Sequence, residues 1–159
     1  MNNIPAGIIA GLVATAALSA LMMLKAQMGV LPGLDVIALL AAIMGTGSAT
    51  GWVLHFLIGA GYGVLFSRIS RSDTFRGAIA KGILLGLVGW VAMMVLLTPV
   101  MGKGLFGLAM PSETMLVPLA TFMLHVIFGA VLGASHRAIT QRIAGTGPKI
   151  ASWETSNGS

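Results

Sequence analysis

Two histidines, His55 and His125, are the residues whose type and setting could do chemistry in this chain. Each lies within a long apolar segment, where an ionisable side chain is costly and therefore suggests a function. Each is followed by glycines four and eight positions later, which on a helix would place a smooth groove beside the imidazole. These glycines are Gly59, Gly63, Gly129 and Gly133. The pattern suggests a haem b held between two axial histidines, with the glycines admitting the macrocycle, or a metal ion bound by both histidines.

A structural role for the same residues is the interpretation that we favour. Histidines inside membrane helices commonly hydrogen-bond a neighbouring helix, and glycines let two helix backbones approach closely. Two histidines are also too few for a closed zinc site, which takes four ligands. We therefore expect no cofactor, with haem b as the alternative. The chain has only four acidic residues and no hydrolase, nucleotide-binding or paired-carboxylate motif, so we expect no catalytic residue and no enzyme activity.

Lys25 and Asp35, on either side of Pro32-Gly33, form a second candidate set. An unpaired charge at membrane depth is expensive, so we expect a structural ion pair, with a proton or ion site as the alternative. Methionines are a third set, because thioethers suit Cu(I), although they are also ordinary packing residues. Those expected near the outer side are Met28, Met44, Met101, Met110 and Met115.

The elements that position these residues are expected to be membrane helices. Of the 159 residues, 57% are apolar and 8% are charged, whereas soluble domains are roughly 25% charged. Four apolar stretches approach or exceed the roughly 20 residues that a bilayer-spanning helix needs, at about 4–24, 49–66, 77–101 and 115–139. We predict an all-α polytopic membrane protein with one membrane domain, residues 1–144, surrounded by the lipid bilayer. The absence of cysteine excludes disulfides and thiolate metal sites.

The connections between the spans predict the topology. Residues 34–44 are apolar but too short to cross, so we expect a short interfacial or re-entrant helix there. Basic residues gather between the second and third spans and after the fourth, at Arg68, Arg71, Arg76, Lys81, Arg137, Arg142 and Lys149. These segments, both termini and the polar tail 145–159 are therefore expected in the cytoplasm. The net charge of +5 is explained by this orientation, and no nucleic-acid partner is expected.

The two halves of the chain resemble each other at an offset of 70 residues. Leu54-His55 and Gly59-Ala60 recur as Leu124-His125 and Gly129-Ala130, Gly7 matches Gly77, and Met22-Met23 matches Met93-Met94 with a one-residue slip. We interpret residues 4–70 and 75–140 as two copies of a helical hairpin, related by an axis along the membrane normal. Stripes of small residues predict close helix packing, at Gly7, Gly11, Thr15 and Ser19 and at Ala78, Gly82 and Gly86.

The stretch from Met22 to Gly29, continuing through Pro32 and Leu34-Asp35-Val36-Ile37 to Gly51-Trp52 and His55-Phe56, resembles a family of small uncharacterised bacterial inner-membrane proteins. The resemblance covers most of residues 7–68. It implies four spans and a location in the bacterial inner membrane. It supplies no activity.

Three functions remain open from the sequence. We favour, narrowly, an accessory or structural subunit of a larger membrane complex, such as a respiratory or other energy-transducing assembly, with other membrane subunits or further copies of the chain as partners. The second is a bis-histidine haem or metal protein. The third is a small transporter or channel, in which a homodimer completes a pathway around Lys25, Asp35, His55 and His125.

Overall fold

The computed structural model describes residues 3–29, 35–70, 74–109 and 116–145, and every secondary-structure element in these ranges is helical. The long helices are α1 (Ile4–Gln27), α3 (Ser48–Ile69), α4 (Phe75–Ala92) and α6 (Leu116–Gly145). The short ones are α2 (Val36–Ile43), the π-helical turn η1 (Met93–Leu97), α5 (Thr98–Val100) and the 3₁₀ turn η2 (Leu105–Gly107). Four helices, with α4 continued to Val100, are long and apolar enough to cross a membrane. The predicted all-α, multi-pass membrane fold is confirmed.

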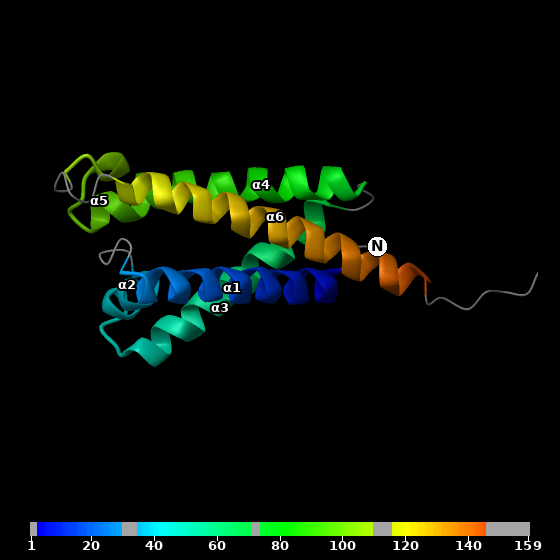
Figure 1. The fold of residues 1–159 in the computed structure, drawn as a ribbon, viewed down its shortest axis with the longest axis horizontal. Helices are drawn as coiled ribbons and strands as arrows, with labels where there is room; N and C mark the ends of the chain where they lie inside the picture. The colour runs from blue at the N-terminus through cyan, green and yellow to red at the C-terminus, as the bar shows by residue number, and fades with distance from the viewer. Residues whose placement is uncertain (1–2, 30–34, 71–73, 110–115, 146–159) are drawn as a thin grey trace, which may run out of the picture.

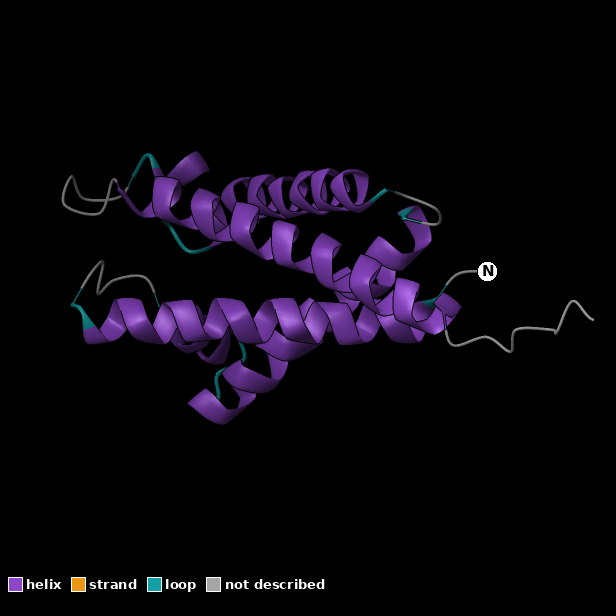
Figure 2. Ribbon diagram, turned by 45° about the vertical axis from the view of Figure 1, so that its right-hand side comes forward, coloured by secondary structure: helices purple, strands orange, loops and turns teal. Residues whose placement is uncertain are grey.

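The long helices form two hairpins (Figure 1). α1 packs against α3, and α4 packs against α6. The chain enters α1 at one end of the molecule and leaves α6 at the same end, while α2 and α5 lie at the opposite end. Figure 2 shows the two hairpins separating toward the α2 end and converging toward the end that holds the N-terminus.

Glycines make both hairpin interfaces unusually close. A Cβ atom on Gly11 would overlap the carbonyl oxygen of Gly59, and one on Gly82 would overlap the carbonyl oxygen of Gly129. Lipid tails are as apolar as leucine, so membrane helices associate through close packing and not through the hydrophobic effect. The predicted close packing of the two small-residue stripes is therefore found inside the chain, between partners of the same hairpin.

The contact between hairpins is asymmetric. α1 also packs against α6. Ala6, Ala10 and Ala14 on α1 are each no more than 1% exposed, and Ala10 and Ala14 belong to one hydrophobic cluster with Phe128 and Leu132 of α6. An exact twofold axis would pair α4 with α3 in the same way that α1 pairs with α6, yet α3 and α4 scarcely touch. α1 and α6 are consequently the two inner helices, and the outer faces of α3 and α4 are left uncovered by the described part of the chain.

A π-helical turn interrupts the third span near its C-terminal end. Pro99 follows this turn, and because proline has no N–H it cannot donate to the carbonyl group four residues earlier. The Thr98 hydroxyl donates to the carbonyl of Met94. A wider turn is a common response to a missing ladder bond. The sequence predicted a third span with Pro99 near its end, but it did not predict the π-helical turn before this proline.

Candidate functional site

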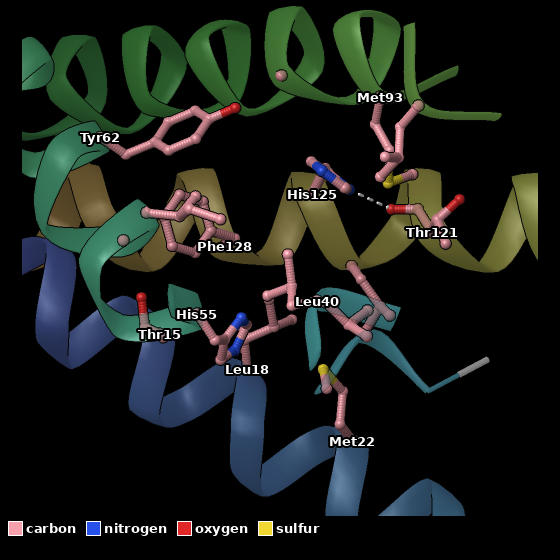
Figure 3. A pocket seen from close by; sticks show the side chains of 16 residues that line it. Thr15, Leu18, Met22, Leu40, His55, Tyr62, Met93, Thr121, His125 and Phe128 are labelled. Carbon is pink, nitrogen blue, oxygen red and sulfur yellow. Dashed lines mark hydrogen bonds between the residues drawn. The ribbon is translucent and has the colours of Figure 1, made fainter. Parts of the chain in front are cut away.

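A cavity of about 220 Å³ lies between the two hairpins (Figure 3). Residues from both hairpins, from α2 and from η1 line it: Thr15, Leu18, Met22, Val36, Leu40, His55, Ile58, Gly59, Tyr62, Gly89, Met93, Leu97, Thr121, Leu124, His125 and Phe128. The two histidines singled out in the sequence therefore reach one site, although they lie 70 positions apart. None of the side chains that line it is an acid, a lysine or an arginine.

His55 reaches the cavity from α3, where Figure 3 shows it beside Leu18 and Leu40. Its side chain is only 8% exposed. Trp52 and Phe56 lie next to the imidazole, with ring centroids 6.2 and 6.0 Å away. The Nε2 atom is buried and has no hydrogen-bond partner in the part of the chain that the structure describes.

His125 reaches the cavity from α6 and lies on the side that faces α4 and Met93 (Figure 3). Its Nδ1 atom is 2.7 Å from the carbonyl oxygen of Thr121, one helical turn earlier. Because a carbonyl only accepts hydrogen bonds, Nδ1 must carry the proton. In the neutral ring the Nε2 atom then holds a lone pair and can only accept a hydrogen bond.

A small network fixes the turn that holds His125. The Trp90 indole N–H on α4 lies 3.2 Å from both the Pro118 carbonyl oxygen and the Thr121 hydroxyl oxygen on α6. The Thr121 hydroxyl itself donates to carbonyl groups of the preceding turn, at 3.0 Å from Val117 and 2.9 Å from Pro118. These contacts tie α4 to α6 beside the cavity, and sequence reasoning did not single out Trp90 or Thr121.

The glycines near the histidines do not form a surface for a macrocycle. Gly59 lines the cavity, but Gly63, Gly129 and Gly133 face the backbones of Gly7, Gly82 and Ala78. Sites that enclose drug-sized ligands are about 300–1,000 Å³, and the cavity is about 220 Å³. The arrangement therefore does not fit a haem, because helix backbone occupies the space that the macrocycle would need.

Comparison with known proteins places the chain in a family but supplies no activity. Residues 1–145 match a family of unknown function, DUF6789. The chain belongs to this family. The match extends through both hairpins, whereas the resemblance seen in the sequence covers most of residues 7–68 and is weaker over the second half. No curated protein and no solved structure matches the chain.

The methionines of this DUF6789 chain are arranged differently from the set considered for copper. Met28 and Met44 are more than half exposed, and Met110 and Met115 lie outside the described residues. Met22 and Met93 line the histidine cavity instead. The signal that could have found them was the repeat, in which these two methionines match each other. No group of three or more His, Asp or Glu side chains that could hold a metal ion occurs within the described ranges.

Asp35 has a structural role at the start of α2. Its Oδ1 atom accepts the backbone N–H of Ala38 at 2.9 Å, which makes it the N-cap of this helix. Lys25 and Asp35 line the same hollow of about 430 Å³, between α1, α2 and α3. The ion pair between them stays a prediction.

Substitution at Asp35 separates its role as the N-cap of α2 from its predicted role in an ion pair with Lys25. Asp35→Ala is expected to lower the free energy of unfolding by about 1 kcal/mol, whereas Asp35→Asn should change it little, because asparagine is an equally good N-cap. The measurement is unfolding in mixed detergent micelles with increasing dodecyl sulfate. If Asn costs as much as Ala, the carboxylate charge and not the cap stabilises this end of the molecule.

Proposed function

We propose that this protein is a non-enzymatic helix-packing subunit of a larger assembly in the bacterial inner membrane. The observation that carries the proposal is an apolar stripe on the outward face of α4, continued by one residue of η1. Its members are Leu84, Val88, Val91 and Val95, which are between 38% and 62% exposed. They are spaced by four, three and four residues, which is the 3.5-residue period of helices that cross at about +20°. This crossing is the usual one in membrane bundles.

The surroundings of the stripe support a helical partner. α4 is the least buried of the four spans, with 22% of its most apolar window buried, compared with 39% for α1. A hollow of about 350 Å³ between α3 and α4 continues the surface and contains Gly61 and Gly89. No atom would lie within 4 Å of a Cβ placed on Gly61. Small, open positions of this kind let a neighbouring helix approach closely.

The charges support an orientation with both termini in the cytoplasm. Arg68 and Arg76 flank the connection between α3 and α4, and Arg137 and Arg142 lie near the end of α6. Figure 1 places the end of α3, the starts of α4 and α1 and the end of α6 at one end of the molecule. Arg and Lys favour the cytoplasmic side in short loops. Of the other five basic residues, Lys81 lies near the start of α4, Lys25 and Lys103 lie at the opposite end of the molecule, and Arg71 and Lys149 lie outside the described residues.

We also propose that the two hairpins arose from one repeated unit. Four pairs of residues lining the cavity are related by 70 or 71 positions: Leu18 and Gly89, Met22 and Met93, His55 and His125, and Ile58 and Phe128. The contacts of Gly11 with Gly59 and of Gly82 with Gly129 follow the same offsets. The match made from the sequence pairs Gly7 with Gly77, at an offset of 70. The contacts of α1 and α4 instead follow an offset of 71, which pairs Gly7 with Ala78.

Purification in a mild detergent tests the proposal. The chain is expected to elute with a second membrane protein in fixed stoichiometry. Val88→Trp should release this partner, because a large ring at the centre of the stripe prevents close helix contact. Ile9→Trp, on an exposed position of α1, is the matched control and should retain it. Elution of the unaltered chain alone, or only with copies of itself, would contradict an accessory role.

A further inference from the structure

The cavity between the hairpins contains hydrogen-bonding atoms that the chain itself does not use. His55 is more than nine-tenths buried, and its Nε2 atom has no partner among the described residues. Buried polar atoms in native structures nearly always have a partner, so an orphan on a side chain that lines a cavity points to a ligand. His125, which is partly buried and also lines the cavity, provides a further acceptor, because its proton is held on Nδ1 by the Thr121 carbonyl and its Nε2 lone pair is left free.

The remaining lining defines the polarity of that ligand. The hydroxyls of Thr15 and Thr121 already donate to backbone carbonyls of their own helices, Thr15 to Gly11 at 2.9 Å. Most of the other lining residues are aliphatic, thioether or aromatic, and none is charged. A charged ligand would therefore lack a counter-charge in a largely apolar site. The ligand that fits is uncharged, largely apolar and able to donate a hydrogen bond.

The size of the cavity limits the ligand to about one substituted ring. An apolar protein cavity of about 150 Å³ holds a benzene molecule, and this one measures about 220 Å³. Phe128 and Tyr62 supply aromatic walls, with ring centroids 5.4 Å apart in an edge-to-face arrangement. Aromatic rings pack favourably in such surroundings.

We infer that this cavity binds an uncharged hydroxylated aromatic ring, a phenol or the ring of a quinol, through hydrogen bonds to the imidazoles of His55 and His125. The hydroxyl donates to the Nε2 lone pair of His125, and a second hydroxyl pairs with the buried Nε2 of His55. An oxidised quinone has only carbonyl acceptors, which cannot pair with an acceptor nitrogen. The reduced ring is therefore preferred at His125. This role is independent of the partner-binding face on α4.

Two fluorinated probes of matched size test the inference. The ¹⁹F NMR lines of 4-fluorophenol and 4-fluorotoluene are followed as purified protein is added, with empty micelles as the reference for partitioning. We expect 4-fluorophenol to bind about tenfold more tightly than 4-fluorotoluene, because only the phenol satisfies a buried nitrogen. Equal affinities of the two probes for the unaltered protein would overturn the inference.

Substitution of the histidines identifies the groups that bind. His55→Phe and His125→Phe keep a ring and remove its nitrogens, and each is expected to lower the affinity for 4-fluorophenol about threefold to tenfold. The double variant should bind both probes alike. His136→Phe is the matched control, because His136 is also buried, packs against Phe66 and does not line the cavity. Unchanged preference for the phenol in a folded double variant would overturn the proposal.

Competition with a longer molecule distinguishes the source of the ring. Displacement of 4-fluorophenol by 2-decyl-1,4-benzoquinol would support a quinol taken from the membrane. Failure of this quinol to displace a phenol that still binds through the histidines would support a small free phenol. If the corresponding benzoquinone displaced 4-fluorophenol as effectively as the quinol does, this result would contradict the hydrogen bond proposed at His125.

Discussion

Replacing Gly63 with alanine is expected to lower the free energy of unfolding by about 1–3 kcal/mol, because the added methyl group has no room. A Cβ atom at this position overlaps the carbonyl oxygen of Gly7, and backbone cannot move aside as a flexible side chain can. Two residues earlier on the same helix, a Cβ atom on Gly61 would meet nothing within 4 Å. Gly61→Ala should therefore be neutral or stabilising by up to about 1 kcal/mol, since alanine is the better helix former.

The stabilities of the two variants are compared by unfolding each in mixed micelles with increasing dodecyl sulfate. The loss of helix is monitored by circular dichroism. The pair shares helix, residue type and substitution, so differences in helix propensity cancel. Equal stability of the two variants would mean that α1 and α3 do not meet through Gly7 and Gly63.

Single cysteines are expected to show an all-or-none labelling pattern across the membrane. The natural chain has no cysteine, so one introduced thiol is the only target for a maleimide. Thr46, between α2 and α3, and Gln141, near the end of α6, are both exposed and lie at opposite ends of the molecule. In intact cells an impermeant maleimide should label Thr46→Cys and should label Gln141→Cys only after the membrane is opened, because the basic end is expected inside.

The cysteine-free parent serves as the background for this experiment. The reverse pattern would place the basic end outside and contradict the proposed orientation. Labelling of both positions from the same side would contradict a topology in which these two positions lie on opposite membrane faces.

The spans and their close contacts could be predicted from the sequence, because bilayer thickness dictates helix length and only small residues permit backbone contact. The proposed repeat would account for His55 and His125 lining one cavity, since matched positions in two repeated hairpins reach matched depth. The spacing of the glycines could not tell whether they contact a neighbouring helix or a bound ligand. Gly63 and Gly129 pack against helices, and the same i+4 pattern would suit a flat ligand equally well.

The N-cap role of Asp35 and the pairing of α1 with α6 could not be predicted from the spacing of apolar residues. Asp35 was considered for its charge, but its position before the apolar run of α2 is also that of an N-cap, as the bond to Ala38 shows. The pairing of α1 with α6, and not of α3 with α4, could not be predicted either. Without a hydrophobic driving force between membrane helices, this choice rests on the shapes of faces such as Ala6, Ala10 and Ala14.

Photo-crosslinking from the α4 stripe tests the accessory role most directly. A photoreactive phenylalanine analogue is placed at Val88, at the centre of the stripe, or at Ile9 on an exposed part of α1, and native membranes are irradiated. The account predicts a discrete adduct with one other membrane protein from Val88 and only lipid adducts from Ile9. Lipid adducts alone from both positions, or an adduct with a second copy of this chain from Val88, would contradict it.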